Sequence, residues 1–103
     1  MGKEKLVRDK IPDIIRAKGL EAQVRRASHD EIDKLLRDKI LEESLELHES
    51  GESIEIADIL EAIYALLEHR EISKMQIESI RKNKSEERGG FSAHLVLNLE
   101  DLE

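Results

Sequence analysis

Five acidic side chains in the middle of the chain are spaced so that they could bind one cation together. They form the pattern Glu42-Glu43-x-x-Glu46, followed by Glu55-x-x-Asp58. Positions three apart on a helix lie on one face, so each half of the pattern gathers carboxylates. Carboxylate oxygens are hard ligands, which favour Mg²⁺ or Mn²⁺ over zinc. The pattern therefore predicts a divalent-metal site that water and substrate phosphate would complete.

Two long helices are expected to carry these carboxylates. Ser28-x-x-Glu31 is a capping box, and the apolar residues that follow it recur at helical spacing, which predicts a helix over residues 29–49. A polar break at residues 50–53 ends this helix. A second apolar helical pattern then covers residues 54–69. The short connection favours an antiparallel hairpin as the core of the fold.

The hairpin would bring the two halves of the acidic pattern together. With its turn near residues 51–52, Glu46 is expected beside Asp58 and Glu43 beside Glu61. Two carboxylates about 6 Å apart repel each other by roughly 3 kcal/mol at an effective dielectric constant near 20. Several such pairs would strongly destabilise a small domain, so the arrangement calls for a cation.

The remaining elements complete a mainly α fold. Pro12 favours a short helix over residues 12–18, and a second capping box favours another over residues 74–84. Residues 21–27 alternate weakly through Ala22 and Val24, residues 91–99 are rich in Leu and Val, and the two segments are expected to pair as a small β-hairpin. The length of 103 residues, without a linker or repeat, predicts a single domain over residues 1–103.

Composition excludes several classes of protein. Ten acidic residues and one basic residue lie between Ile40 and Glu71, and such a centre does not suit the binding of duplex nucleic acid. There is no cysteine, which excludes disulfides and thiolate metal sites and favours a reducing cytoplasm. The longest purely apolar run, residues 62–67, is too short to cross a membrane. We therefore predict a soluble, cytoplasmic protein that binds neither membranes nor duplex DNA.

The chain is also expected to form an oligomer. A domain of this size buries a limited share of its surface, and aromatic residues make up only 2% of the sequence. The apolar surface of the helix over residues 54–69 is broad enough to be buried on more than one side. We predict a homodimer or homotetramer in which the hairpins form a four-helix-type bundle.

The acidic pattern and its flanks resemble a known family. The order Glu42-Glu43-x-x-Glu46 then Glu55-x-x-Asp58 is similar to the signature of the MazG-like, all-α nucleoside triphosphate pyrophosphohydrolases, which include phosphoribosyl-ATP pyrophosphohydrolase. Leu6-Val7-Arg8-Asp9-Lys10-Ile11-Pro12 and the segment from Lys84 to Phe91 resemble a small single-domain subgroup. The resemblance thus spans most of the chain.

The resemblance implies roles for the individual acids. Glu43, Glu46, Glu55 and Asp58 are the expected Mg²⁺ ligands, with Mn²⁺ as a substitute. Glu42 would bind a second ion or act as the base that orients water, and Glu42 and Glu55 are interchangeable as catalytic candidates. Glu61 lies outside the family pattern, and a role behind the ligands or at a second ion is a further hypothesis. The other acids of the region are expected to be solvated.

Four cations are candidates for binding the polyphosphate. The resemblance suggests Lys84 and Arg88, and more weakly Arg8 and Lys10, because arginine can hold two phosphate oxygens at once. Each has a simpler explanation. Lys84 and Arg88 would also favour the C-terminus of a helix, and Arg8 and Lys10 would also form surface ion pairs with nearby aspartates.

The family's activity is then the leading functional hypothesis. It is the Mg²⁺-dependent hydrolysis of a canonical or damaged nucleoside triphosphate to the monophosphate and pyrophosphate, as house-cleaning of the nucleotide pool. The alternatives are phosphoribosyl-ATP hydrolysis in histidine synthesis and a non-catalytic nucleotide-binding helical module. A purely structural helical oligomer is the simplest alternative, and it predicts no stabilisation by divalent metal.

Overall fold

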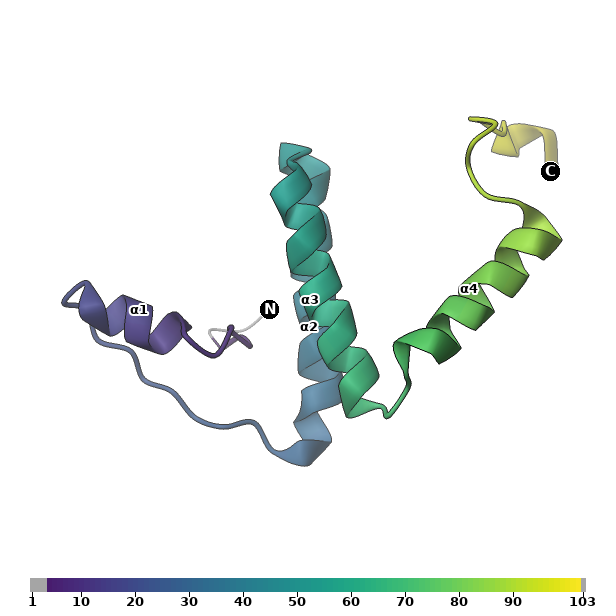
Figure 1. The fold of residues 1–103 in the computed structure, drawn as a ribbon. Coiled ribbons are helices and arrows are strands. Elements are labelled where there is room, and N and C mark those ends of the chain that lie inside the picture. The colour runs from purple at the N-terminus through teal and green to yellow at the C-terminus, as the bar shows by residue number, and fades with distance from the viewer. Residues whose placement is uncertain (1–3, 103) are drawn as a thin grey trace. The chain divides into compact units, whose positions relative to one another are not determined.

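The computed structural model describes residues 4–102 and contains four α-helices (Figure 1). Helix α1 spans Ile11–Ala17, α2 spans His29–Ser50, α3 spans Ser53–His69 and α4 spans Lys74–Arg88. A short 3₁₀ helix, η1, covers Leu99–Leu102. The mainly α prediction is therefore confirmed, and each predicted helix is present, although α4 continues four residues beyond its predicted end.

The predicted β-hairpin is wrong, because the described part of the chain contains no strand. Residues 21–27 have no regular structure, and residues 91–99 form a turn and an irregular stretch that leads into η1. A β pattern needs a partner for its backbone N–H and C=O groups, and neither segment supplies one to the other. Phe91 and Val96 remain almost fully exposed.

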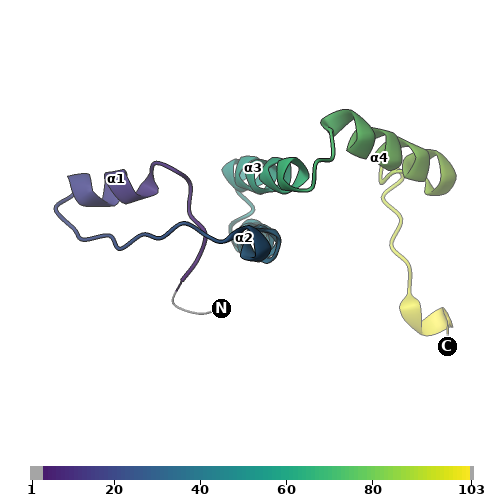
Figure 2. The same cartoon turned by 90° about the horizontal axis from the view of Figure 1, so that it is seen from below.

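The antiparallel pair α2 and α3 forms the centre of the N-terminal part (Figures 1 and 2). Local chemistry determines where these helices begin and end. The N–H of Ser28 donates to Glu31 Oε2 at 2.8 Å, as the predicted capping box requires. Gly51 follows α2 in the left-handed region with φ 67°, and its N–H donates to the Leu47 carbonyl at 2.8 Å. The chain therefore reverses within two residues.

The chain divides into two compact units between Ile72 and Ser73. The first holds α1, α2 and α3, and its buried apolar residues among those described are Leu36, Ala62 and Leu67. The second holds α4 and η1, and α4 buries no residue. The N–H of Gln76 donates to Ser73 Oγ at 3.0 Å, so the second capping box is present as well. No helix in residues 4–102 is long and apolar enough to span a membrane.

Candidate metal and phosphate site

The hairpin brings acids from both helices together. Ligand oxygens of Glu43, Glu55 and Asp58 lie within 4.8 Å of one another, and those of Glu42, Glu43 and Glu46 form a second group at the same limit. Glu43 belongs to both groups. All five acids of the sequence pattern thus lie in two groups that share one carboxylate, and every ligand atom is a carboxylate oxygen. This donor set fits Mg²⁺ or Mn²⁺.

Glu43 is the acid of α2 that groups with Glu55 and Asp58 of α3. It also lines one cavity with Glu61, its predicted neighbour, whereas the pairing of Glu46 with Asp58 stays a prediction. Glu43 takes this position because of the face of α2 that packs on α3. Glu43 shares the heptad-spaced stripe of Leu36 and Leu47 and is buried, whereas Glu46 lies at its edge and is exposed. Glu43 is therefore the carboxylate of α2 that meets those of α3.

Burial changes the chemistry of Glu43. It is the buried charged residue of the described chain, with 8% of its surface exposed. This burial raises the pKa of the Glu43 carboxyl above its usual value, because removal from water disfavours the charged form. The neighbouring Lys39, whose Nζ lies 3.3 Å from Glu43 Oε1, favours the charged form and partly offsets this effect.

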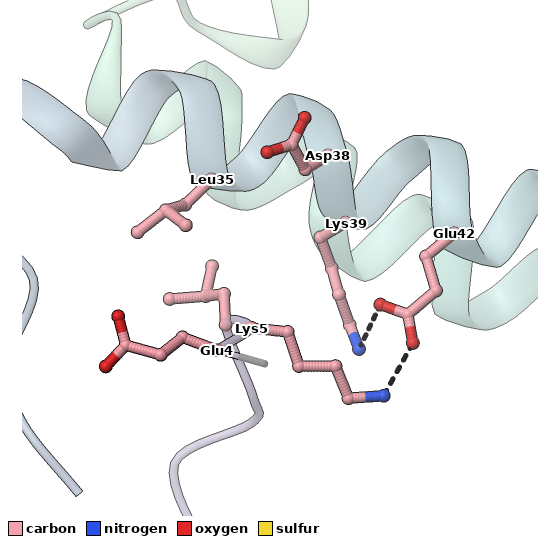
Figure 3. Close-up of a pocket in the computed structure, with 7 residues that line it drawn as sticks. Glu4, Lys5, Leu35, Asp38, Lys39 and Glu42 are labelled. Atoms are coloured by element: carbon pink, nitrogen blue, oxygen red, sulfur yellow. Dashed lines mark hydrogen bonds and ion pairs between the residues drawn. The ribbon is translucent and has the colours of Figure 1, made fainter. Parts of the chain in front are cut away.

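Two lysines converge on Glu42, as Figure 3 shows. Lys5 Nζ donates to Oε1 at 2.7 Å, and Lys39 Nζ donates to Oε2 at 3.3 Å. The hydrogen bond from Lys5 holds the pKa of the Glu42 carboxyl below its usual value, and the same contact raises the pKa of Lys5. Both oxygens of Glu42 are thus occupied by cations, which makes this carboxylate a weaker proton acceptor.

Arg8 forms the corresponding contact on α3. Its Nη2 donates to Asp58 Oδ1 at 2.8 Å. The simpler explanation of Arg8 from the sequence, an ion pair with an aspartate close by in the chain, is therefore wrong, because its partner lies 50 positions away. Lys10 is exposed and has no ion pair within residues 4–102. Exposed ion pairs of this kind typically contribute below about 1 kcal/mol to stability, so Arg8 is free to exchange partners.

A cavity of about 350 Å³ adjoins these groups. Its charged lining includes Arg8, Lys39, Glu43, Asp58 and Glu61. A smaller cavity of about 80 Å³ is lined by Lys5, Lys39 and Glu42 among others (Figure 3). The larger volume is within the usual range for small-molecule sites, roughly 300–1,000 Å³. Acidic and basic side chains therefore line one cavity in the first unit.

The other predicted phosphate ligands lie in the second unit. Lys84 and Arg88 are exposed and four residues apart on the last turns of α4. The chain after them turns at Gly89, whose φ is 85°. Because α4 continues to Arg88, this spacing places both cations on one helical face, and their role at a phosphate stays a prediction.

Sequence reasoning missed Lys5 and Lys39. Lys39 lies three and four positions before Glu42 and Glu43, which is the spacing of a helical ion pair, so this signal was available in the sequence. The contact of Lys5 with Glu42 joins positions 37 apart and carries no local signal.

Comparisons of the chain with protein-family models, with curated proteins and with solved structures found no significant match.

Proposed function

We propose that the protein is a Mg²⁺-dependent nucleotide pyrophosphohydrolase of the MazG-like type, acting on nucleoside triphosphates in the cytoplasm. The observation that supports this most strongly is the group of Glu43, Glu55 and Asp58, whose oxygens lie within 4.8 Å across two helices. Such close acids repel one another strongly unless cations lie among them. A metal with a polyphosphate suits both the acids and the basic side chains beside them.

In this proposal Glu43 and Asp58 bind metal in one group and Glu46 in the other, with Glu55 as a further ligand unless it serves as the base. When bound, Mg²⁺ neutralises phosphate oxygens and lowers the pKa of a coordinated water. The reaction adds water across the bond between the α and β phosphates, so the products are the monophosphate and pyrophosphate. A carboxylate must accept the proton of the attacking water. Since the lysines weaken Glu42 as a base, we favour Glu55 for this step and Glu42 as a charged anchor.

Cations around the acids would hold the phosphates. Arg8 and Lys39 line the larger cavity together with Glu43 and Asp58. Arginine suits a phosphate because its planar group can donate two parallel hydrogen bonds. We assign Arg8 and Lys39 to the polyphosphate within the first unit, and we keep Lys10, Lys84 and Arg88 as further candidates.

The proposal includes an oligomer. Ile56, Leu60 and Tyr64 follow one another every four residues on α3, and each is 40% exposed or more. This stripe is an apolar surface on α3, and Leu41 and Leu45 of α2 are exposed as well. A second copy of the hairpin would cover it and give the four-helix-type bundle of a homodimer or homotetramer.

The test is a product assay. Purified protein is incubated with canonical and damaged nucleoside triphosphates and with phosphoribosyl-ATP, in Mg²⁺ or in EDTA, and monophosphate and pyrophosphate are quantified. We expect equimolar products only with Mg²⁺, and loss of turnover in Glu55→Gln and Asp58→Asn. Glu49→Gln, an exposed acid of α2 outside both groups, is the matched control. Turnover of phosphoribosyl-ATP alone would instead indicate the biosynthetic reaction, and no turnover at all would contradict the proposal.

A further inference from the structure

The segment 4–10, which precedes α1, is attached to both helices of the hairpin through its cations. Lys5 donates to Glu42 of α2 at 2.7 Å, and Arg8 donates to Asp58 of α3 at 2.8 Å. Each acceptor belongs to one of the two carboxylate groups described above. The segment, here called the strap, therefore contacts each group once.

A third ion pair holds the beginning of the strap. Arg25 donates from Nε and Nη2 to the two oxygens of Glu4, both at 3.2 Å, and from Nη1 to Glu31 at 2.8 Å. Glu31 is in the first turn of α2. Between the charged contacts, Leu6 is half-buried and lines both cavities. The strap is thus positioned at several points, mainly by ion pairs.

These contacts occupy one oxygen of each of two carboxylates that belong to the candidate metal groups. An oxygen that accepts a hydrogen bond from an ammonium or guanidinium group has a lone pair directed at that proton, and a divalent ion bound there would also repel the cation. The two cationic side chains can leave, because Lys5 and Arg8 are 55% and 52% exposed. Lys39 differs, since it is 19% exposed and belongs to α2 itself.

We propose that the strap and a divalent metal compete for the same carboxylates, so that metal binding releases Lys5 and Arg8 from the hairpin. This inference rests on the proposed metal site. Released from Asp58, Arg8 can bind a phosphate of the substrate beside the metal. Without metal, the strap neutralises the acids through its ion pairs. Arg8 then becomes available to bind a phosphate only when metal is bound.

The first measurement is Mg²⁺ and Mn²⁺ affinity by calorimetry, without nucleotide. Loss of the competing ion pairs in the double variant Lys5→Gln/Arg8→Gln should tighten binding about two- to tenfold. Lys10→Gln removes one charge from the same strap without removing an ion pair of the described chain, and its affinity should stay close to that of the wild type. Circular dichroism confirms that each variant retains its helices.

The second measurement follows the strap in the wild-type chain. Limited trypsin digestion, with EDTA in the metal-free arm and no Ca²⁺ in either arm, compares cleavage of the Arg8–Asp9 bond with cleavage of the Lys18–Gly19 bond, which serves as the internal reference for trypsin activity. Saturating Mg²⁺ should raise this ratio severalfold, because trypsin needs a free arginine side chain.

The outcomes separate the two proposals. Equal affinities of the double variant and Lys10→Gln, or a cleavage ratio that Mg²⁺ leaves unchanged, would overturn the strap while leaving the metal-dependent activity standing. Absence of metal binding in every variant would overturn the proposed function and the strap together.

Discussion

Arg8 Nη2 donates to Asp58 Oδ1 at 2.8 Å, joining residues 50 positions apart. The contact places a guanidinium on a carboxylate that the sequence pattern assigns to a metal. Arg8 and Asp58 therefore have opposite expected effects on metal binding, although they form one ion pair. In our proposal Asp58 supplies a ligand to the metal, whereas Arg8 competes for it.

Asp58→Asn should abolish stabilisation by Mg²⁺. A ligand at about 100 times its Kd stabilises a folded protein by about 2.7 kcal/mol, which raises the melting temperature measurably. The amide keeps the shape of the side chain but lacks the charge, so the Mg²⁺-induced rise should disappear. Differential scanning fluorimetry with and without Mg²⁺ measures this. Glu52→Gln, which changes an exposed acid outside both carboxylate groups, should keep the full rise.

Glu43→Gln should stabilise the protein without metal and remove its response to metal. Burial raises the pKa of Glu43, so the charged form is disfavoured in the folded state relative to the unfolded state. Its contribution to stability is therefore largest at low pH and declines as the pH rises from the unfolded pKa through the folded pKa. The neutral isostere should raise the melting temperature by a few degrees at pH 7. A melting temperature that falls in Glu43→Gln would show that the ion pair with Lys39 dominates over burial.

Glu31 should make the free energy of unfolding depend on pH in the opposite sense to Glu43. Hydrogen bonds, first from Arg25 and then from the Ser28 N–H, lower the pKa of Glu31 to about 2. A carboxyl with a lowered folded pKa stabilises the protein above its unfolded pKa of about 4.5. This contribution is lost as the pH falls from about 4.5 toward about 2. Urea unfolding across this interval should show a shallower pH dependence in Glu31→Gln than in the wild type.

Asp33 provides a second test of this dependence of stability on pH. Its pKa is also lowered, by hydrogen bonds from Arg70 and then Arg37, so Asp33→Asn should likewise reduce the acid dependence. Asp30→Asn, in the same first turn of α2 as Glu31, changes an exposed acid that has no ion pair within the described chain. An equal change in all three variants would contradict the assignment to specific partners.

Local signals account for what the sequence predicts well. The capping boxes at Ser28 and Ser73 place the starts of α2 and α4, and Gly51 places the end of α2, because each signal acts within four residues. The grouping of the five acids follows as well, since helical spacing and a short connection determine it. Periodicity therefore predicts the helices and the proximity of these five acids.

Contacts between distant residues are what the sequence leaves undetermined. The apolar alternation after Phe91 resembles a strand, yet strand formation depends on a partner far along the chain, and residues 21–27 do not provide one. The pairings of Lys5 with Glu42 and of Arg8 with Asp58 likewise join segments 37 and 50 positions apart. No helical or strand period relates such residues, so only the structure reveals that cations lie on the acids.

Gly51→Ala tests how much the left-handed backbone at the tight reversal matters for stability. Gly51 has φ 67°, and a Cβ built there meets nothing within 4 Å, so the substitution carries a backbone penalty without a clash. We expect a loss of about 1–2 kcal/mol in unfolding free energy. Gly90, which lacks a positive φ and whose added Cβ would lie 3.9 Å from Ser85 Oγ, is the matched control for alanine substitution. Urea titration of both variants measures the difference.

Leu60→Glu should separate the copies of the chain without unfolding the hairpin. Leu60 is 42% exposed in the middle of the stripe formed with Ile56 and Tyr64, so a charge there meets solvent in one copy but would be buried between two. Sedimentation velocity should show an oligomer for the wild type and a monomer for Leu60→Glu, with unchanged helical content. Leu20→Glu places the same charge on a 61% exposed leucine outside the hairpin and should leave the mass unchanged. A wild type that sediments as a monomer at every concentration would contradict the four-helix-type bundle, because the apolar stripe would then stay in water.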